Sequence, residues 1–192
     1  MLIIISGFSG SGKNTVINEL IKRNENLSFL KSCTTRKKRP NENKDAYIFL
    51  CKKTFDKMLE KGDISEYEEI HQNFYGIAKS SLDEVVSCDK EKKHFIKDVG
   101  VLGQISLTRI LKDKVKTLSI FLTAPKKELI KRLTLRGEPD IDLRLSRMEF
   151  EENYKGNFDI VINNANLNKT IKIIEKLIKK NEVIENTIKK SK

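Results

Sequence analysis

A glycine-rich segment near the start of the chain has the composition of a phosphate-binding loop. It reads, in order, Gly7, Phe8, Ser9, Gly10, Ser11, Gly12, Lys13, Asn14 and Thr15. Glycines let the backbone curl so that several N–H groups point at one anion, and a following helix adds partial positive charge at its start. Lys13 can then bridge the outer phosphates. The segment predicts a polyphosphate site, with an ordinary glycine-rich turn as the alternative.

The residue after the lysine departs from the usual pattern of such loops. Ser or Thr is common there, because its hydroxyl ligates Mg²⁺, but this chain has Asn14 followed by Thr15. Asn14 can offer its amide oxygen to the metal or hold a metal-bound water. We therefore expect Mg²⁺ as the cofactor and Asn14 as the candidate ligand.

A second polar group follows at residues 32–40. Arg36 and Arg39 lie three residues apart, close to the hydroxyls of Ser32 and Thr34. A guanidinium pairs bidentately with phosphate oxygens, so two of them suit a dianionic phosphate. An exposed basic turn is the structural alternative.

The elements that must position these groups alternate between strand and helix. Apolar runs predict strands at 2–6, 27–32, 94–98, 117–123 and 158–163, and helical spacing predicts helices at 13–23, 102–111, 126–135, 143–154 and 167–180. This alternation predicts an α/β fold, with a three-layer parallel sheet and right-handed crossovers.

Three segments do not fit the alternation. Residues 33–90 hold short strand patterns and two short helical patterns (54–61 and 79–87), so we interpret them as an inserted α+β subdomain between core segments 1–32 and 91–181. Residues 134–143 carry Gly137 and Pro139 between two helices and predict a short lid. Residues 182–192 are rich in Lys and Asn and predict a flexible C-terminal tail.

Composition narrows the classes of partner. The net charge of +11 is compatible with a nucleic-acid surface, but the lysines are spread along the whole chain and no basic stripe alternates with aromatics. We therefore expect no nucleic-acid partner. No apolar run approaches the roughly 20 residues of a membrane-spanning helix. Three cysteines without metal-ligand spacing fit a cytoplasmic protein, and the sequence leaves monomer and homodimer both open.

Taken in order, the motifs resemble the guanylate kinase family. After the phosphate loop they are Ser32-x-Thr34-Thr35-Arg36-x-x-Arg39-Pro40, Tyr47-x-Phe49, Glu66-Tyr67, Asn73-Phe74-Tyr75-Gly76, Arg132-Leu133-x-x-Arg136-Gly137, Arg144-Leu145 and Val161-Ile162-Asn163-Asn164. They extend over residues 2–178, nearly the whole chain. The resemblance implies a P-loop nucleoside monophosphate kinase that uses ATP and Mg²⁺ and acts on GMP.

The resemblance also implies a role for each matching residue. The implied ATP site comprises Gly7, Ser9, Gly10, Ser11, Gly12, Lys13, Asn14, Thr15, Arg132 and Asn163. The implied GMP site comprises Ser32, Arg36, Arg39, Tyr47, Glu66, Tyr75 and Asp98. Catalysis would rest on Lys13, Arg36, Arg136 and Arg144, which supply charge without a general base because the acceptor phosphate is already anionic.

Some of these residues have structural alternatives. Glu66 suits the two adjacent donors of guanine, N1–H and the 2-amino group, but also suits a solvated strand. Asp98 suits the acceptor ribose or the metal, or a helix N-cap. Arg147 fits a helix surface as well as it fits the site.

Several positions depart from the family pattern. Ile77 stands where the family usually has a Ser or Thr that helps to read guanine O6, and Ala46 stands where an Asp usually precedes the tyrosine. The strand end Ile96-Lys97-Asp98 has lost an acidic residue, and the lid is about two residues short. Ile77 and Lys97 motivate one alternative, a kinase of the same fold with another phosphorylated acceptor. A catalytically inactive interaction module is a second, against which the intact Gly12-Lys13 pair stands.

Overall fold

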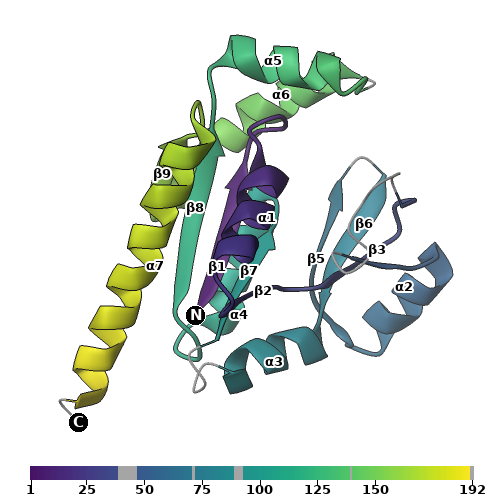
Figure 1. Ribbon diagram of the computed structural model, residues 1–192. Coiled ribbons are helices and arrows are strands. Elements are labelled where there is room, and N and C mark those ends of the chain that lie inside the picture. Colours follow the sequence, from purple (N-terminus) through teal and green to yellow (C-terminus); the bar gives the residue numbers. More distant parts are fainter. Residues whose placement is uncertain (39–46, 71, 89–92, 139, 191–192) are drawn as a thin grey trace.

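Five parallel strands form the sheet on which the rest of the molecule is built (Figure 1). The structure is a computed structural model that describes residues 1–38, 47–70, 72–88, 93–138 and 140–190. The strands of this sheet are β1 (Leu2–Gly7), β2 (Leu27–Phe29), β7 (His94–Asp98), β8 (Thr117–Thr123) and β9 (Ile160–Asn163). Their order is β2-β7-β1-β8-β9, and every neighbouring pair is parallel.

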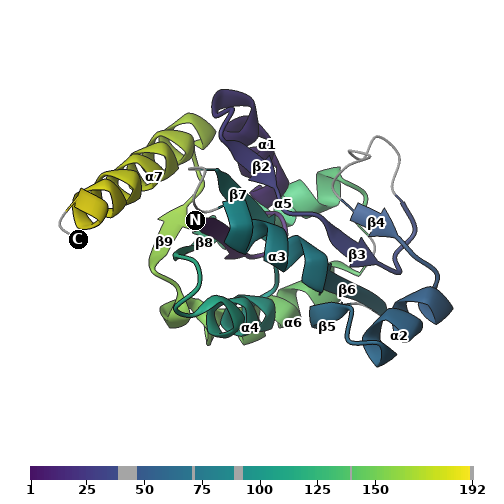
Figure 2. The same ribbon diagram turned by 90° about the horizontal axis from the view of Figure 1, so that it is seen from below.

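Helices cover both faces of this sheet (Figure 1, Figure 2). One face carries α1 (Lys13–Arg23) and α7 (Leu167–Lys190), and the other carries α3 (Lys79–Cys88) and α4 (Val101–Leu111). Alternate side chains of the central strand β1 serve the two layers: Ile3 and Ile5 pack toward α1 and α7, whereas Leu2 and Ile4 pack toward α3 and α4. A strand buried on both faces reads as a continuous apolar run. The predicted three-layer α/β fold is confirmed.

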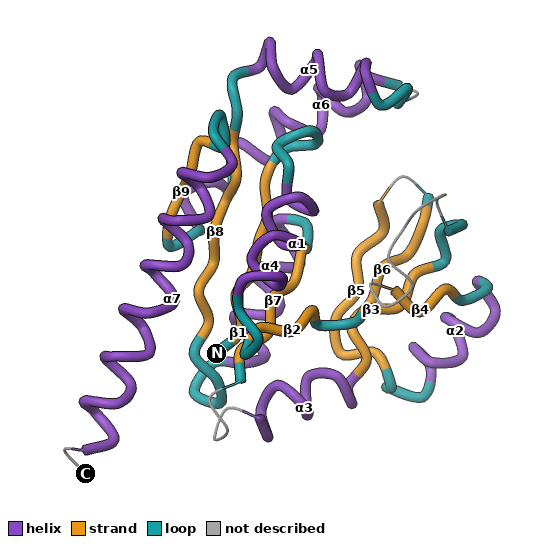
Figure 3. The backbone as a smooth tube through the Cα atoms, viewed as in Figure 1, coloured by secondary structure: helices purple, strands orange, loops and turns teal. Residues whose placement is uncertain are grey.

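A second sheet of four strands lies beside the first (Figure 3). Its strands are β3 (Ser32–Thr34), β4 (Tyr47–Phe49), β5 (Ile64–Ile70) and β6 (Asn73–Ala78), in the order β4-β3-β6-β5. The helix α2 (Lys52–Glu60) packs against it through the fully buried Phe55, which contacts Cys33 and Ile64. This sheet and helix form a small core of their own.

Two helices lie over the carboxyl ends of the large sheet's strands (Figure 1). They are α5 (Lys126–Leu135) and α6 (Ile141–Glu152), followed by a 3₁₀ turn (Lys155–Asn157). Leu129 of α5 joins Phe8, Phe121 and Phe158 in an apolar cluster that fixes this layer to the sheet. In the described part of the chain, no helix is both long and apolar enough to cross a membrane.

The prediction of one strand over residues 27–32 is wrong. This stretch forms β2 of the large sheet and β3 of the small one, with a break at Leu30 and Lys31. The Leu30 N–H still donates to the Ile96 carbonyl at 2.9 Å, but its side chain enters the α3–α4 layer, and the chain then leaves the sheet. The apolar sequence does not reveal this change of direction, because Leu30 stays buried where the chain passes from one sheet to the other.

Two other elements differ from expectation. β6, whose aromatic and polar residues show no clear alternation, was not predicted as a strand; it forms through its antiparallel pairing with β5 and β3. The last helix, α7, continues to Lys190, whereas its apolar periodicity predicted an end at residue 180. Flexibility of the C-terminal tail stays a prediction.

Neighbouring residues of α7 provide a test of how this helix is held. Ile174 is fully buried against the sheet, whereas the adjacent Ile173 is 39% exposed. Ile174→Ala should lower the free energy of unfolding by about 2–5 kcal/mol because it leaves a cavity. Ile173→Ala should change it by about 0.5 kcal/mol. Urea unfolding measures both, and equal losses would contradict this packing.

Candidate active site

The loop between β1 and α1 has the geometry of an anion cradle. Gly10 and Gly12 have left-handed φ values of 83° and 90°, which favour glycine. Gly7 lies so close to β8 that a Cβ there would be 2.1 Å from the Leu122 carbonyl oxygen. Gly12 is the N-cap of α1 and no side chain caps this helix among the described residues. The first N–H groups of α1 therefore have no intrahelical partner and can bind an anion.

Asn164 and Arg132 hold this loop from behind. The Asn164 side-chain amide donates to the Ser11 carbonyl at 2.8 Å, and its own N–H donates to the Thr123 carbonyl at 2.7 Å. Arg132 donates to the Gly10 carbonyl at 3.3 Å and to the Asn164 carbonyl at 3.5 Å. The end of β9 and helix α5 thus fix the loop's shape.

Lys13 turns back over the loop. Its ammonium donates to the carbonyls of Gly7 and Phe8 at 2.6 and 3.2 Å. Burial lowers the pKa of Lys13, while the charges of Glu151 and Asp98 act in the opposite direction. A polyphosphate in the cradle would replace these carbonyls with stronger, charged acceptors.

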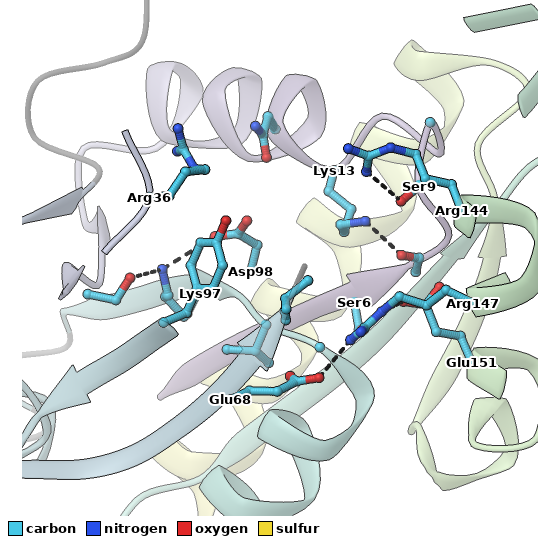
Figure 4. A pocket seen from close by; sticks show the side chains of 18 of the residues that line it. Ser6, Ser9, Lys13, Arg36, Glu68, Lys97, Asp98, Arg144, Arg147 and Glu151 are labelled. Atoms are coloured by element: carbon cyan, nitrogen blue, oxygen red, sulfur yellow. Dashed lines mark hydrogen bonds and ion pairs between the residues drawn. The ribbon is translucent and has the colours of Figure 1, made fainter. Parts of the chain in front are cut away.

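One pocket joins this loop to the second sheet (Figure 4). The predicted site residues that line it are Gly7, Ser9, Gly10, Gly12, Lys13, Asn14, Ser32, Arg36, Tyr47, Glu66, Tyr75, Asp98, Arg136 and Arg144. Ser11, Thr15, Arg132 and Asn163 are predicted ATP-site residues that do not line it. Arg39 lies outside the described residues.

The far end of the pocket carries a cluster around Tyr47. The Tyr47 hydroxyl donates to the Asp98 carboxylate at 3.3 Å. The Arg36 guanidinium lies 5.5 Å from the centre of the Tyr47 ring, and the Tyr75 ring lies 6.1 Å from it. Burial, the Asp98 charge and Tyr75 all raise the pKa of Tyr47, so its hydroxyl stays protonated and can donate. A guanidinium and phenol hydroxyls together suit a phosphate group.

Glu66 is a buried carboxyl in the wall of the same pocket. It is 8% exposed, and a Cβ on Gly103 would lie 3.0 Å from its Oε1, so α4 approaches this carboxyl closely at a glycine. Burial and, to a smaller extent, the charge of Glu68 raise the pKa of Glu66 to about 7, against an opposing effect of Lys97. Among the described residues, none donates a hydrogen bond to this carboxyl. It can therefore receive donors from a ligand.

Arginines at the end of α5 and in α6 line the pocket beside the phosphate loop, and Figure 4 shows Arg144 there. Arg144 of α6 bonds to Glu138 at 2.5 Å and to the Ser9 hydroxyl of the loop at 3.4 Å. Arg136, at the end of α5, lines the pocket with its side chain exposed. These guanidiniums lie where they can neutralise phosphates bound at the loop.

The structure also brings in residues that sequence reasoning did not assign to the site. Those with hydroxyl or charged side chains are Ser6, Glu68, Lys97, Glu138, Arg147 and Glu151. Arg147 bonds to Glu68 at 2.7 Å and to Glu151 at 3.3 Å, joining α6 to β5. Spacing four residues apart on one helix could have linked Arg147 to Glu151. The contact with Glu68 depends on tertiary structure alone.

Comparison with known proteins decides the family. The guanylate kinase family matches residues 1–181. A guanylate kinase from Prochlorococcus marinus is 39% identical over 186 residues, covering 93% of this chain and 96% of that relative. This chain belongs to the guanylate kinase family. The resemblance inferred from the ordered motifs is therefore confirmed.

Further relatives agree with this membership. A guanylate kinase from Chlorobium chlorochromatii is 36% identical over 182 residues, covering 92% of this chain and 93% of the relative. The crystal structure of a guanylate kinase from Anaplasma phagocytophilum has the same fold, with a TM-score of 0.74 at 23% identity over 94% of this chain and 85% of that one. The family fold thus extends over both sheets described above.

A glycine pair tests the cradle. Gly12→Ala should abolish binding of inorganic triphosphate, because it strains a left-handed residue and puts a Cβ 2.7 Å from the Asn164 amide nitrogen. Gly156→Ala is the control, since its Cβ would meet no atom within 4 Å. Calorimetric titration measures binding and thermal unfolding monitors the fold. Unchanged triphosphate affinity in Gly12→Ala would contradict the assignment.

Proposed function

We propose that this chain is a guanylate kinase that transfers the γ-phosphoryl group of ATP to GMP, giving ADP and GDP. The observation that carries the proposal is the shared pocket: a phosphate cradle lines one end, and Glu66, Arg36 and Tyr47 line the other. A phosphoryl donor and a nucleotide acceptor would meet between them. Membership of the guanylate kinase family supports this assignment.

On the donor side, the loop would hold the β- and γ-phosphates of ATP. The N–H groups at the start of α1 and the Lys13 ammonium provide the contacts, as the geometry of the cradle suggests. Arg132 supports the loop through Gly10, so its effect on ATP would pass through the loop's shape. The proposed contact of Asn163 with the adenine follows from its place at the end of β9.

On the acceptor side, Arg36, Tyr47 and Tyr75 would hold the phosphate of GMP. Glu66 would accept hydrogen bonds from guanine N1–H and the 2-amino group, which form two adjacent donors. Its lack of a donor among the described residues supports this role. Ser32 would lie near the base, and Arg39 stays a predicted phosphate ligand.

Transfer itself needs alignment and positive charge. The acceptor oxygen is already anionic, so the chain has to supply no general base. Lys13, Arg136 and Arg144 would neutralise charge on the transferring group, which preorganised cations do most effectively in a site shielded from water. We infer that Arg144 exchanges Glu138 for phosphate when nucleotides bind, with residues 134–143 closing as a lid.

The residues present fit a Mg²⁺ ion. Asn14 is exposed and lines the pocket in the first turn of α1, and its amide oxygen is a hard ligand of the kind that Mg²⁺ accepts. One protein ligand is sufficient, because Mg²⁺ at such sites keeps several waters and phosphate oxygens. When bound, the ion would reduce repulsion between the phosphates. Among the described residues, no group of three or more His, Cys, Asp or Glu forms a separate metal site.

Neither alternative gains support from the structure. An inactive interaction module has no need of an intact cradle, and a different acceptor would leave Glu66 without its proposed partners. The cytoplasmic location, the absence of a nucleic-acid partner and a monomeric or homodimeric state stay predictions.

An acceptor panel tests the proposal directly. With Mg²⁺ and ATP, ADP release should be fastest with GMP, slower with IMP because the 2-amino group is missing, and lowest with AMP, UMP and CMP. Lys13→Met should remove the activity and so control for a contaminating kinase. No turnover with GMP, dGMP or IMP would overturn the proposal, and a preference for another acceptor would favour the alternative kinase.

The ionisation of Glu66 gives a prediction about pH. Its pKa of about 7 means that the carboxyl is mostly protonated below pH 7 and then cannot accept both guanine donors. GMP binding should therefore strengthen as the pH rises through 7 and weaken as it falls. From pH 8 to pH 6 the KM for GMP should rise about tenfold more in the wild type than in Glu66→Gln.

Glu66→Gln is the matched control for this pH profile, because the GMP phosphate, with a second pKa of about 6, titrates in both proteins alike. Parallel pH profiles for the two proteins would show that Glu66 does not titrate in the binding step.

A further inference from the structure

Lys97 is a buried cation in the wall of the acceptor pocket. It lies on β7, is 2% exposed and lines the pocket beside Asp98. Its ammonium donates to the Ser32 hydroxyl at 2.9 Å and to the Asp98 carboxylate at 3.4 Å (Figure 4). Lysines are rarely buried so completely, because removing the ammonium from water costs hydration free energy that its partners must offset.

Negative groups and aromatic rings surround the Lys97 ammonium. Burial lowers the pKa of Lys97, and the charges of Asp98, Glu66 and Cys33 offset part of that lowering. The ammonium also lies 4.5 Å from the centre of the Phe29 ring and 4.8 Å from that of Tyr47. Aromatic faces attract cations at such distances. The pocket wall therefore presents a hydrogen-bond donor that contacts Ser32, Asp98 and two aromatic rings.

Glu66 lines the same pocket as Lys97 and, when ionised, accepts hydrogen bonds, whereas Lys97 donates them. It and Lys97 influence each other's charge, yet no direct ion pair joins these two residues. Ile77, opposite Glu66 in the strand register, also lines the pocket and belongs to an apolar cluster, so it offers no hydrogen bond. The polar groups that line the pocket together with Ile77 include an acceptor at Glu66 and donors at Lys97 and Ser32.

We propose that Lys97 reads the purine base by donating a hydrogen bond from its ammonium to the 6-keto oxygen of guanine. The inference rests on the proposed function. Guanine presents one acceptor followed by two donors along its edge, so it needs a donor such as Lys97 and an acceptor such as Glu66, and both line this pocket. Adenine presents a 6-amino donor and an N1 acceptor, which would meet like groups at both positions. Lys97 thereby distinguishes guanine from adenine at position 6. The apolar side chain of Ile77 cannot do so, because it forms no hydrogen bond.

Analogues of GMP separate this contact from the others. The 5′-monophosphate of 6-thioguanosine keeps N1–H and the 2-amino group but replaces the keto oxygen with sulfur, a weak acceptor. IMP keeps the keto oxygen and lacks the 2-amino group. The first analogue therefore probes Lys97, and the second probes Glu66.

Lys97→Met removes the ammonium and keeps a side chain of similar length between the two rings. In the wild type, kcat/KM for GMP should exceed that for the thio analogue by roughly 10- to 100-fold, the usual value of a charged hydrogen bond. In Lys97→Met this ratio should fall to within about threefold of unity, while the ratio of GMP to IMP stays at the wild-type value. If Lys97 had a purely structural role, Lys97→Met would lower kcat/KM for GMP, the thio analogue and IMP by the same factor.

Controls keep the outcomes distinct. Lys112→Met makes the same charge change at an exposed position that does not line the pocket, and should leave both ratios unchanged. Competition binding of GMP and the thio analogue without ATP gives the same comparison independently of catalysis. If Lys97→Met does not fold, as judged by thermal unfolding, Lys97→Gln takes its place and should show a ratio below the wild-type value.

A wild-type ratio of GMP to the thio analogue in the folded variant would overturn the inference and leave the proposed function standing. Absence of GMP binding and turnover in the wild type would instead overturn the proposed function.

Discussion

The parallel pairing of β1 with strands on both sides is the constraint on which the site depends. β7 and β8 hydrogen-bond to the two edges of β1, and the pairing with β8 continues to Gly7, where only glycine fits against Leu122. Parallel strands end at the same edge of a sheet, and ligands bind in the crevice beyond their carboxyl ends. The phosphate loop after β1 and Asp98 at the end of β7 are brought together for this reason.

Most of the cations that line the pocket are paired with acceptors of the chain itself. Arg144 lies on Glu138, Arg147 on Glu68 and Glu151, and Lys97 on Asp98, while Lys13 uses backbone carbonyls. A buried or half-buried charge without a partner is costly, which accounts for the pairing of these four cations. On the proposed function, nucleotide phosphates would replace the partners of Lys13 and Arg144. Binding would therefore exchange one partner of each cation for another and would not leave the cation unpaired.

The acceptor end belongs to neither sheet alone. Ser32, Tyr47 and Glu66 come from the small sheet, whereas Lys97 and Asp98 come from β7 of the large one. The bonds from Lys97 to Ser32 and from Tyr47 to Asp98 cross between the sheets. A base bound there would contact both sheets at once, so acceptor binding and the relative position of the sheets depend on each other.

The sequence by itself determined the local chemistry of this protein. The phosphate loop, the central strand and helix α1 could be predicted, because glycine positions and apolar periodicity act over a few residues. The ordered motifs also identified the family and most of the pocket. Tertiary structure alone decided that residues 27–32 divide between two sheets and that Arg147 contacts Glu68. It also decided that Lys97 is buried and donates to the Ser32 hydroxyl. Such contacts join residues far apart in the chain, and no local pattern records which side chain a distant strand will meet.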